Sequence, residues 1–496
     1  MVERVTHWIN GKPWGEPAAR HGEVFDPTTG EVAAHVDFAT ATDVDQAVQA
    51  AAQAFPAWSR TSLARRTTIL FRFRQLLLEH ADEIAATVSA EHGKVRSDAR
   101  GEFDRGLEVV EFACGIAHLL KGEFSENVAT NVDTYSVRQP LGVVAGITPF
   151  NFPAMVPMWM FPLAIACGNT FVLKPSEKDP SASIMLAELL AEAGLPDGVF
   201  NVVHGDREAV EAVLDHPQIA AVSFVGSTPV ARHIYETAAR NGKRVQALGG
   251  AKNHMVVLPD SDLDVAADAA VSAGFGSAGE RCMAISVVVA VDPVGDDLVE
   301  RIRERAAQVQ VGPGTDPASQ MGPLISAAHR DKVASYLDPE RTGGGTVVLD
   351  GRGRTVDGHA GGYWLGPSLV DQVRPGTPVY DDEVFGPVLS VVRAASYDEA
   401  VEIINADTRG NGVAIFTNDG GMVRRFRMDV TAGMMGVNVP IPVPMSFYSF
   451  GGWKDSLFGD LSIYGPDGVR FYTRPKVTVS RWQEHSSVDL GFPTNQ

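Results

Sequence analysis

Short apolar runs alternate with amphipathic stretches along most of the chain after Leu141. Apolar runs of this length are typical of buried strands, whereas the stretches between them have the spacing of helices. The runs predict strands at Gly142–Ile147, Thr170–Leu173, Gly198–Val203, Ala220–Phe224, Val245–Leu248 and Met255–Leu258. Helices are predicted in the gaps at Ile184–Ala193, Arg207–Leu214 and Pro229–Gly242. This alternation is typical of a parallel, doubly wound α/β sheet.

A second set of strands and helices follows Asp264 and predicts a second α/β domain. Its elements are predicted at Val287–Val291, Asp296–Val309, Thr346–Leu349, Val388–Val392 and Tyr397–Ala406. Ahead of the first set, strands are predicted at Glu23–Pro27 and Val32–Phe38, and helices at Asp43–Phe55 and Leu63–His92. A chain of 496 residues is too long for one core, which agrees with two or three domains.

Two further segments, Asn131–Val137 and Lys476–Ser480, alternate polar and apolar residues. A period of two is typical of strands with one exposed face. Because exposed strands of this kind often pair with another chain, we expect a small β ribbon that joins subunits.

The stretch between Arg138 and Lys174 carries no charged residue. A membrane-spanning helix needs about 20 continuous apolar residues. Here the run is interrupted by prolines and asparagines, at Pro149, Asn151, Pro153, Pro157, Pro162 and Asn169. The first residues also lack the apolar run of a signal peptide. We therefore expect a soluble core at this stretch and no membrane association.

Charge and cysteine content narrow the class of protein further. The net charge is −19 and the pI about 5.1, so there is no surplus of lysine and arginine for nucleic acid binding. The three cysteines, Cys114, Cys167 and Cys282, are too few for a disulfide framework and form no CxxC pair. A reducing compartment, and hence a cytoplasmic location, is expected.

Cys282 lies between a glycine-containing turn, which includes Gly279, and the apolar strand that begins near Ser286. This position suits a thiolate that attacks a carbonyl carbon at a domain cleft, and the neighbouring cation of Arg281 can lower the thiol pKa. The alternative, on this segment alone, is a buried and inert thiol.

Four other segments place polar groups at the ends of predicted strands. Asn151 lies in a rigid, proline-flanked loop and suits a donor to an oxyanion. Lys174 ends a buried strand, where open α/β sheets bind ligands. Gly226 and Ser227 form a turn before a helix whose free N–H groups suit phosphate. Glu383 precedes the aromatic ring of a loop that reads Glu-Val-Phe-Gly-Pro-Val.

Each of these segments also has an ordinary structural interpretation. The asparagine could hold its own loop, the lysine could be solvated, and the turn could start a simple capped helix. The segment after Gly226 lacks a complete GxGxxG, so the usual Rossmann fingerprint is absent. The glutamate loop, taken alone, is an ordinary junction between a loop and a strand.

Together and in this order, the segments closely resemble the NAD-dependent aldehyde dehydrogenase superfamily over essentially the whole chain. The resemblance implies an aldehyde dehydrogenase-like fold, with two doubly wound α/β domains and a small β ribbon for oligomerisation. It implies NAD binding by residues 1–120 and 139–248 and catalysis by residues 249–455. The segments 121–138 and 470–490 would be the oligomerisation strands of a homotetramer.

The resemblance also implies roles for individual residues. Cys282 would be the nucleophile, and its backbone N–H would hold the oxyanion together with Asn151. The other matched residues would bind the cofactor: Lys174 and Glu177 at the adenosine ribose, Gly226 and Ser227 at the diphosphate, and Glu383, Phe385 and Phe150 at the nicotinamide end.

One position departs from the hydrolytic members of the superfamily. They carry a glutamate in a Glu-Leu-Gly-Gly-Lys segment, which activates the water that cleaves the thioester. Here the segment reads Ala247-Leu248-Gly249-Gly250, with alanine at that position. Without a general base, attack by water loses a factor of about 10² to 10⁴. Coenzyme A, a thiol, is therefore the expected acceptor, and the alternative is that Glu280 replaces the missing base.

Three segments, Gly250–His254, Gly279–Ala284 and Val437–Pro444, resemble one branch of the superfamily, the CoA-acylating methylmalonate-semialdehyde dehydrogenases. That branch usually has glutamine where this chain has Glu280. It matches Arg105 and Arg281 to residues that bind the substrate carboxylate, whereas the helical pattern leaves open whether Arg105 binds an anion or extends along the surface. No metal site is expected.

The expected reaction is NAD-dependent, CoA-acylating oxidation and decarboxylation of methylmalonate or malonate semialdehyde to propionyl-CoA or acetyl-CoA. The expected partners are thus a small semialdehyde and coenzyme A. The alternative is a hydrolytic NAD(P)-dependent aldehyde dehydrogenase that acts on another acid semialdehyde.

Overall fold

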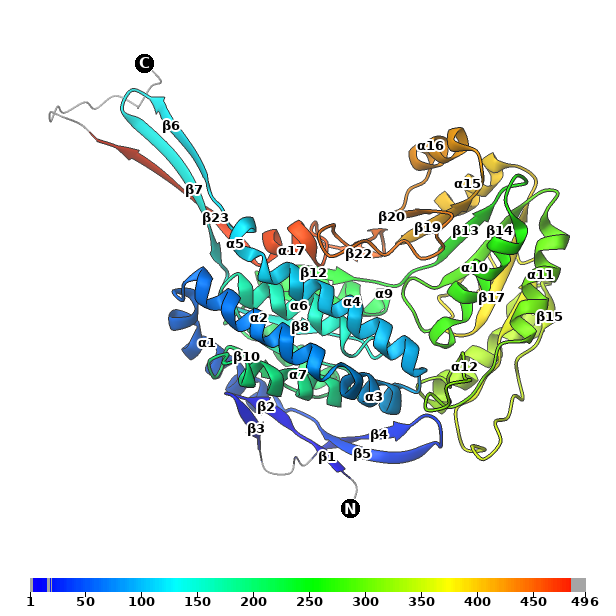
Figure 1. Ribbon diagram of the computed structural model, residues 1–496, viewed down its shortest axis with the longest axis horizontal. Helices are drawn as coiled ribbons and strands as arrows, with labels where there is room; N and C mark the ends of the chain where they lie inside the picture. The colour runs from blue at the N-terminus through cyan, green and yellow to red at the C-terminus, as the bar shows by residue number, and fades with distance from the viewer. Residues whose placement is uncertain (1–2, 16–17, 19, 483–496) are drawn as a thin grey trace.

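Two helix-covered β-sheets lie beside each other in the computed structural model, which describes residues 3–15, 18 and 20–482 (Figure 1). The first sheet has eight strands in the order β22-β12-β11-β8-β9-β10-β2-β3. Its strands are β22 (Leu457–Phe458), β12 (Arg244–Leu248), β11 (Ile219–Val225), β8 (Val143–Ile147), β9 (Thr170–Lys174), β10 (Phe200–Val202), β2 (His7–Ile9) and β3 (Lys12–Trp14). The run from β12 to β10 is parallel, as predicted, and the edge strands β2, β3 and β22 are antiparallel additions.

The second sheet has seven strands in the order β15-β16-β17-β14-β13-β19-β20. They are β15 (Thr346–Leu349), β16 (Ser368–Asp371), β17 (Val388–Ala394), β14 (Ile285–Val291), β13 (Asn253–Val257), β19 (Gly412–Phe416) and β20 (Met434–Val437). The pattern had grouped the strand at Met255–Leu258 with the first set, and this grouping is wrong, because β13 pairs with β14 and β19. An apolar run predicts a buried strand but not the sheet to which it belongs.

Helices cover both faces of the first sheet. One face is covered by α1 (Ala41–Ser59), α8 (Arg207–Asp215) and α9 (Thr228–Arg240). The opposite face is covered by α2 (Leu63–Glu79), α4 (Arg96–Cys114), α6 (Met155–Ala166) and α7 (Ser181–Glu192), with α3 (Ala81–His92) and α5 (Ile116–Leu119) beside them. The single helix predicted at Leu63–His92 is therefore two helices, which meet at His80, where the backbone leaves helical geometry.

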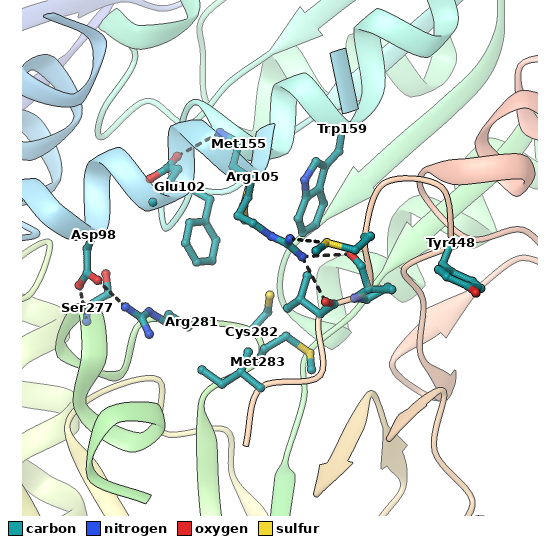
Figure 2. A pocket seen from close by; sticks show the side chains of 16 residues that line it. Asp98, Glu102, Arg105, Met155, Trp159, Ser277, Arg281, Cys282, Met283 and Tyr448 are labelled. Atoms are coloured by element: carbon teal, nitrogen blue, oxygen red, sulfur yellow. Dashed lines mark hydrogen bonds and ion pairs between the residues drawn. The ribbon is translucent and has the colours of Figure 1, made fainter. Parts of the chain in front are cut away.

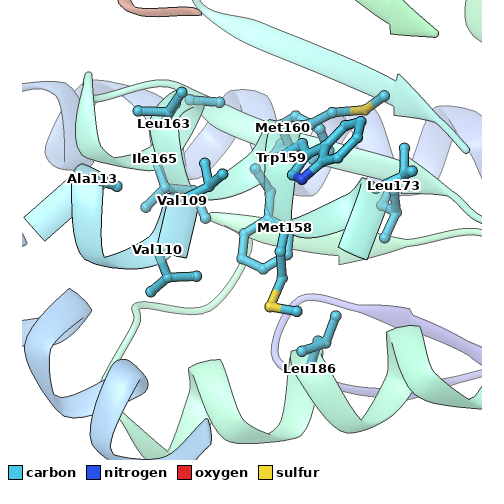
Figure 3. Packing of buried hydrophobic residues seen from close by; sticks show 14 of the residues in the cluster. Val109, Val110, Ala113, Met158, Trp159, Met160, Leu163, Ile165, Leu173 and Leu186 are labelled. Carbon is cyan, nitrogen blue, oxygen red and sulfur yellow. The ribbon is translucent and has the colours of Figure 1, made fainter. Parts of the chain in front are cut away.

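The uncharged stretch of the sequence forms β8, α6 and β9. Every residue of α6 is buried, and this helix packs against α4; Met158 and Trp159 of α6 belong to the same apolar cluster as Val109 and Val110 of α4 (Figure 3). A helix that is apolar on all sides is stable in water only when it is enclosed in this way. Among the described residues, no helix is both long and apolar enough to cross a membrane.

The helices around the second sheet, and the remaining short elements, complete the two bodies. Around the second sheet lie α10 (Leu263–Phe275), α11 (Gly295–Ala307), α12 (Ala327–Ala334), α13 (Pro339–Thr342), α14 (Pro378–Asp381), α15 (Tyr397–Ala406) and α16 (Gly420–Asp429). The short elements elsewhere are β1 (Glu3–Val5), β4 (His21–Asp26), β5 (Glu31–Asp37), β18 (Arg409–Gly410), β21 (Trp453–Lys454) and α17 (Gly465–Phe471).

An antiparallel arm extends away from both bodies (Figure 1). It consists of β6 (Glu123–Ala129), β7 (Val132–Pro140) and β23 (Thr473–Arg481), in the order β23-β7-β6. Both predicted ribbon segments are thus strands, and within one chain they pair with each other. The last part of the predicted segment 470–490, residues 483–490, lies outside the described residues. Pairing of the arm with another subunit remains a prediction.

Candidate active site

Cys282 follows a tight left-handed turn between α10 and β14. Ser277, Ala278 and Gly279 have φ angles of 52°, 52° and 73°. A left-handed conformation is unfavourable for serine and alanine by roughly 1–2 kcal/mol each. At Gly279 a side chain is also excluded, because an added Cβ would lie 2.2 Å from the carbonyl oxygen of Gly386. The turn therefore holds the cysteine against the loop that carries Glu383 and Phe385.

Two asparagine side chains hold the backbone of Cys282 in place. The Nδ2 atom of Asn253 donates to the carbonyl oxygen of Cys282 at 2.9 Å, and that of Asn411 donates to the same oxygen at 3.3 Å. Asn253 also donates to the carbonyl of Ala284 at 2.9 Å. The sequence did not single out these residues, because an asparagine at a strand end usually serves its own loop.

Cys282 opens into a cavity of about 710 Å³ between the two bodies (Figure 2). Apolar side chains of α6 and of the loop after β20 form much of its wall, and charged side chains of α4 and Arg281 form its polar part. Its lining residues are Asp98, Gly101, Glu102, Arg105, Phe152, Met155, Trp159, Ser277, Arg281, Cys282, Met283, Ile441, Val443, Pro444, Met445 and Tyr448. The cavity thus brings the Cys282 thiol and two guanidinium groups together, as the matched residues predict.

Burial, together with the nearby carboxylate of Glu383, raises the pKa of the Cys282 thiol to about 12. Arg281 acts in the opposite direction but does not outweigh these two effects. The cation next to the cysteine is thus insufficient to make a thiolate in this form of the protein. If Cys282 acts as a nucleophile, a base or a bound ligand is expected to assist removal of its proton.

Asn151 is buried in the loop between β8 and α6. Its carbonyl oxygen accepts a hydrogen bond of 2.7 Å from Lys94, whose ammonium forms a 2.7 Å ion pair with Glu102. Glu102 also accepts hydrogen bonds from the backbone N–H groups of Ala154 and Met155 at 2.8 and 3.1 Å. Lys94 and Glu102 therefore fix the loop, and the sequence pattern did not reveal either of them.

Phe150 packs against three other rings. Its ring centre lies 5.9 Å from that of Phe385, 5.9 Å from that of His92 and 6.2 Å from that of His329.

The Glu280 carboxylate has no solvent exposure. One of its oxygens accepts from the backbone N–H of Ile325 at 3.3 Å and lies 3.5 Å from Nε2 of His329. Burial raises the pKa of Glu280 to about 8.

Glu280 is not among the residues that line the cavity at Cys282. A general base must reach the water that it activates, either directly or through one further water molecule. Enclosure of this carboxylate beside two histidines therefore disfavours the alternative in which Glu280 replaces the missing base.

The residues expected to hold the dinucleotide lie at the carboxyl ends of β9 and β11. Nζ of Lys174 lies 3.1 Å from a carboxylate oxygen of Glu177. Gly226 allows close packing, since a Cβ there would lie 2.4 Å from the ring of Phe224. Ser227 is exposed at the start of α9, and its side chain makes no capping hydrogen bond within the described part of the chain. The backbone N–H groups of this helix start suit a diphosphate.

Glu383 is held from two directions. Its Oε1 accepts from the backbone N–H of Ala251 at 3.0 Å, and its side chain lies over Gly250, where a Cβ would come within 2.1 Å of Oε2. The buried Lys252 donates to the carbonyl oxygens of Val379 and Asp382 at 3.0 and 2.8 Å, and thereby fixes the segment before Glu383. Burial also raises the pKa of the Glu383 carboxyl.

The interpretation of Ala247 as the residue facing the nucleophile is wrong. Ala247 packs with Val245 and Phe224 on the sheet face covered by α1, α8 and α9. Leu248, the next residue of β12, packs on the opposite face, in the cluster against which Cys282 lies. A shift of one residue in a strand moves every side chain to the other face.

Matching the Glu-Leu-Gly-Gly-Lys segment through Lys252, instead of through its glycines, puts Leu248 in the glutamate position. The departure itself remains, because neither Ala247 nor Leu248 is a carboxylate. The residue that replaces the base is thus leucine, an apolar side chain on the same face of the sheet as Cys282.

Arg105 and Arg281 both line the cavity, but each is already engaged. Nη1 of Arg105 lies 3.0 Å from Glu108, and Nη2 donates to the carbonyl oxygens of Val443 and Pro444 at 3.1 and 3.0 Å. Nη2 of Arg281 donates to Asp98 at 2.6 Å. Figure 2 shows Arg105 above Cys282 and Arg281 to one side of it, with its guanidinium turned toward Asp98. Nη1 of Arg105 also contacts Sδ of Met445 at 3.3 Å, so its terminal N–H groups are engaged, whereas the N–H groups of Arg281 that do not reach Asp98 are suited to a small carboxylate.

Comparison with known proteins identifies relatives over nearly the whole length of the chain. Residues 14–478 match the model of the aldehyde dehydrogenase family. The chain is 53% identical over 492 residues to a malonate-semialdehyde dehydrogenase of Pseudomonas aeruginosa, covering 98% of this chain and 99% of the relative. It is 51% identical to malonate-semialdehyde dehydrogenase 3 of Geobacillus kaustophilus, covering 97% of this chain and 100% of the relative.

Solved structures agree in fold. The methylmalonate-semialdehyde dehydrogenase of Oceanimonas doudoroffii has a TM-score of 0.96 at 52% identity, covering 98% of this chain and 99% of that chain. A Sinorhizobium meliloti protein described as a methylmalonate-semialdehyde dehydrogenase, crystallised with NAD, also has a TM-score of 0.96, at 50% identity and with the same coverage. The predicted fold is confirmed, and the chain belongs to the aldehyde dehydrogenase family.

Proposed function

We propose that this protein is an NAD-dependent, CoA-acylating dehydrogenase that oxidises and decarboxylates malonate or methylmalonate semialdehyde. The observation that carries the proposal is the cavity at Cys282. It presents two guanidinium groups beside the thiol, and a leucine occupies the position of the usual hydrolytic glutamate. The names of the relatives, which share about half of their residues with this chain over nearly full length, support the same substrates.

The residues at the carboxyl ends of β9 and β11 fit NAD. Gly226 and the free start of α9 suit its diphosphate, while Lys174 and Glu177 suit hydroxyl groups of a ribose. Glu383 and the Phe150–Phe385 pair suit the nicotinamide end, next to the cysteine. When bound, NAD supplies an acceptor for the hydride. We assign NAD binding to residues 1–120 and 139–248, and catalysis to residues 249–455.

In the proposed reaction, Cys282 loses its proton and its sulfur adds to the aldehyde carbon. Asn151 and the backbone N–H of Cys282 stabilise the oxygen that becomes negative. Loss of hydride from the same carbon leaves a thioester on the cysteine. Arg105 and Arg281 orient the substrate carboxylate, which leaves as CO₂ with its bonding electrons remaining on the α-carbon.

Protonation of that carbon completes an acetyl or propionyl thioester. The thiol of coenzyme A then attacks the thioester and gives up its proton, and the sulfur of Cys282 leaves. The apolar side chain of Leu248 offers no base to activate water, so transfer to a thiol is the faster route. The products are acyl-CoA, CO₂ and reduced cofactor.

The test is CoA dependence. Purified protein with malonate semialdehyde and NAD should form acetyl-CoA, identified by mass spectrometry, and should turn over slowly without CoA. Formation of free acid at the same rate with and without CoA would overturn the proposal in favour of a hydrolytic enzyme.

We also propose that the arm joins subunits of a homotetramer. Val477 and Val479 on the edge strand β23 are 63% and 66% exposed, and Phe124 on β6 is 64% exposed. Apolar side chains on an open sheet edge favour pairing with a second chain. Replacing both valines with glutamate should lower the mass measured by light scattering. An unchanged mass would contradict this assignment.

A further inference from the structure

Asp98 connects the substrate cavity to the turn that carries the nucleophile. Its Oδ1 accepts from Nη2 of Arg281 at 2.6 Å, and its Oδ2 accepts from the backbone N–H of Ser277 at 2.9 Å (Figure 2). The side chains of Asp98 and Arg281 are each 21% exposed, so their ion pair is shielded more than a surface pair. One carboxylate thus holds both the guanidinium and the start of the left-handed turn.

The same ion pair separates two cavities. Asp98 and Arg281 line the cavity at Cys282, and they also line a second cavity of about 300 Å³. The second cavity lies against α10 and is lined by Asp268 and Arg305, among others. The guanidinium of Arg281 therefore has open space on both sides. Without a fixed partner it could turn toward Asp268 and away from the substrate.

Gly276 restricts the guanidinium from a third direction. A Cβ at this position would lie 2.5 Å from Nη1 and 2.7 Å from Cζ of Arg281. The φ angle of Gly276 is −55°, which any residue can adopt. A side chain at this position would therefore displace the guanidinium of Arg281, although the backbone conformation would allow it.

We propose that Asp98 and Gly276 are positioning residues that hold Arg281 in the wall of the substrate cavity, and thereby determine the preference for aldehydes that carry a carboxylate. The inference rests on the proposed function, because it assumes that Arg281 binds the substrate carboxylate. Beyond the proposed function, it names the residues that hold Arg281 where its guanidinium can bind the substrate carboxylate. Asp98 leaves the other N–H groups of the guanidinium for the substrate.

The test compares malonate semialdehyde with propanal, an aldehyde of the same carbon number without the carboxylate. The Asp98→Asn variant keeps the size of the side chain but loses its charge and one acceptor oxygen. Its KM for malonate semialdehyde should rise about tenfold, whereas its KM for propanal should stay within about twofold, since only the charged substrate uses Arg281. Gly276→Ala should shift the same ratio by displacing the guanidinium.

Arg281→Gln separates failure of this inference from failure of the proposed function. If Arg281→Gln leaves the ratio of the two KM values unchanged, Arg281 does not bind the carboxylate and that part of the proposed function fails. If Arg281→Gln changes the ratio but Asp98→Asn does not, the positioning role alone is overturned. The double variant Asp98→Asn/Arg281→Gln should have the same ratio as Arg281→Gln, because Asp98 acts through Arg281.

Asp104→Asn is the matched control. Asp104 lies on the same helix and accepts from Nε of Arg100 at 2.9 Å, but the pair is exposed and lies outside both cavities. This variant should leave both KM values unchanged. Equal losses of kcat on both aldehydes in Asp98→Asn, with no change in the ratio, would indicate that Asp98 only supports the turn, and would overturn the proposal.

Discussion

The ammonium of Lys94 lies 2.7 Å from the carboxylate of Glu102, and neither side chain has any solvent exposure. Each partner also binds the backbone of the loop that carries Asn151. A buried ion pair contributes little net stability compared with apolar residues, but loss of one partner leaves a charge enclosed without compensation. The pair is therefore best understood as a device that fixes the loop.

Removal of one charge of this pair should be strongly destabilising. We expect Glu102→Gln to lower the free energy of unfolding by about 3–5 kcal/mol, because the Lys94 ammonium stays enclosed. Lys94→Met/Glu102→Gln should be more stable than Glu102→Gln, since no charge remains. Urea denaturation followed by fluorescence measures both. The explanation would be contradicted if the double variant lost as much unfolding free energy as Lys94→Met and Glu102→Gln lose together.

Leu248→Glu should give the enzyme a hydrolytic activity. Leu248 lies on the sheet face of Cys282, so a carboxylate there can activate water for attack on the thioester. Release of free acid without CoA should rise by about tenfold or more. Ala247→Glu is the informative control, because its charge would be buried among apolar side chains on the far face. If the Ala247 variant hydrolysed the thioester and the Leu248 variant did not, Ala247 and not Leu248 would occupy the position of the hydrolytic glutamate.

The reactivity of Cys282 toward iodoacetamide should rise steadily with pH. Burial and the Glu383 carboxylate hold the thiol pKa at about 12, so the thiolate fraction increases throughout the range in which the protein is handled. Glu383→Gln should speed alkylation about three- to tenfold near pH 8, and Arg281→Gln should slow it, since the two charges act in opposite directions. Equal rates in both variants would exclude this electrostatic account.

Glu280→Gln should stabilise the protein at alkaline pH. Burial raises the pKa of this carboxyl from 4.5 to about 8, so the folded chain binds more protons than the unfolded chain between these values. Stability therefore falls as pH rises through this window, and glutamine removes the effect. The gain should be on the order of a few kcal/mol at about pH 8. Thermal unfolding of the two proteins between about pH 7 and pH 9 measures it, above the range in which unfolded histidine titrates.

Periodicity predicted most of the strands and helices, because a buried parallel strand and an amphipathic helix leave clear patterns. It could not separate α2 from α3, since the break at His80 involves neither proline nor glycine. Nor could it place β13 in the second sheet, because an apolar run does not identify its neighbours.

The sequence predicted the residues of the candidate site that belong to family motifs, but not the residues that hold them in place. Cys282, Arg105 and Arg281 do line one cavity, as the family motifs imply. Asp98 and Glu102 were missed because charged residues on a helix are usually solvated, and only tertiary packing turns them inward. The position of Ala247 was wrong by one residue, because the glycines of the segment match in two registers and only the face of the strand decides between them.

Helix α4 carries Asp98, Glu102 and Arg105 on one side, at the spacing of successive helical turns. Asp98 is bonded to the turn before the second sheet, and Glu102 to the start of α6 on the first sheet. The helix therefore fastens the two bodies together along one edge of the cleft. If these bonds persist while ligands are exchanged, the edge of the cleft along α4 stays closed, and any widening occurs on the side away from it.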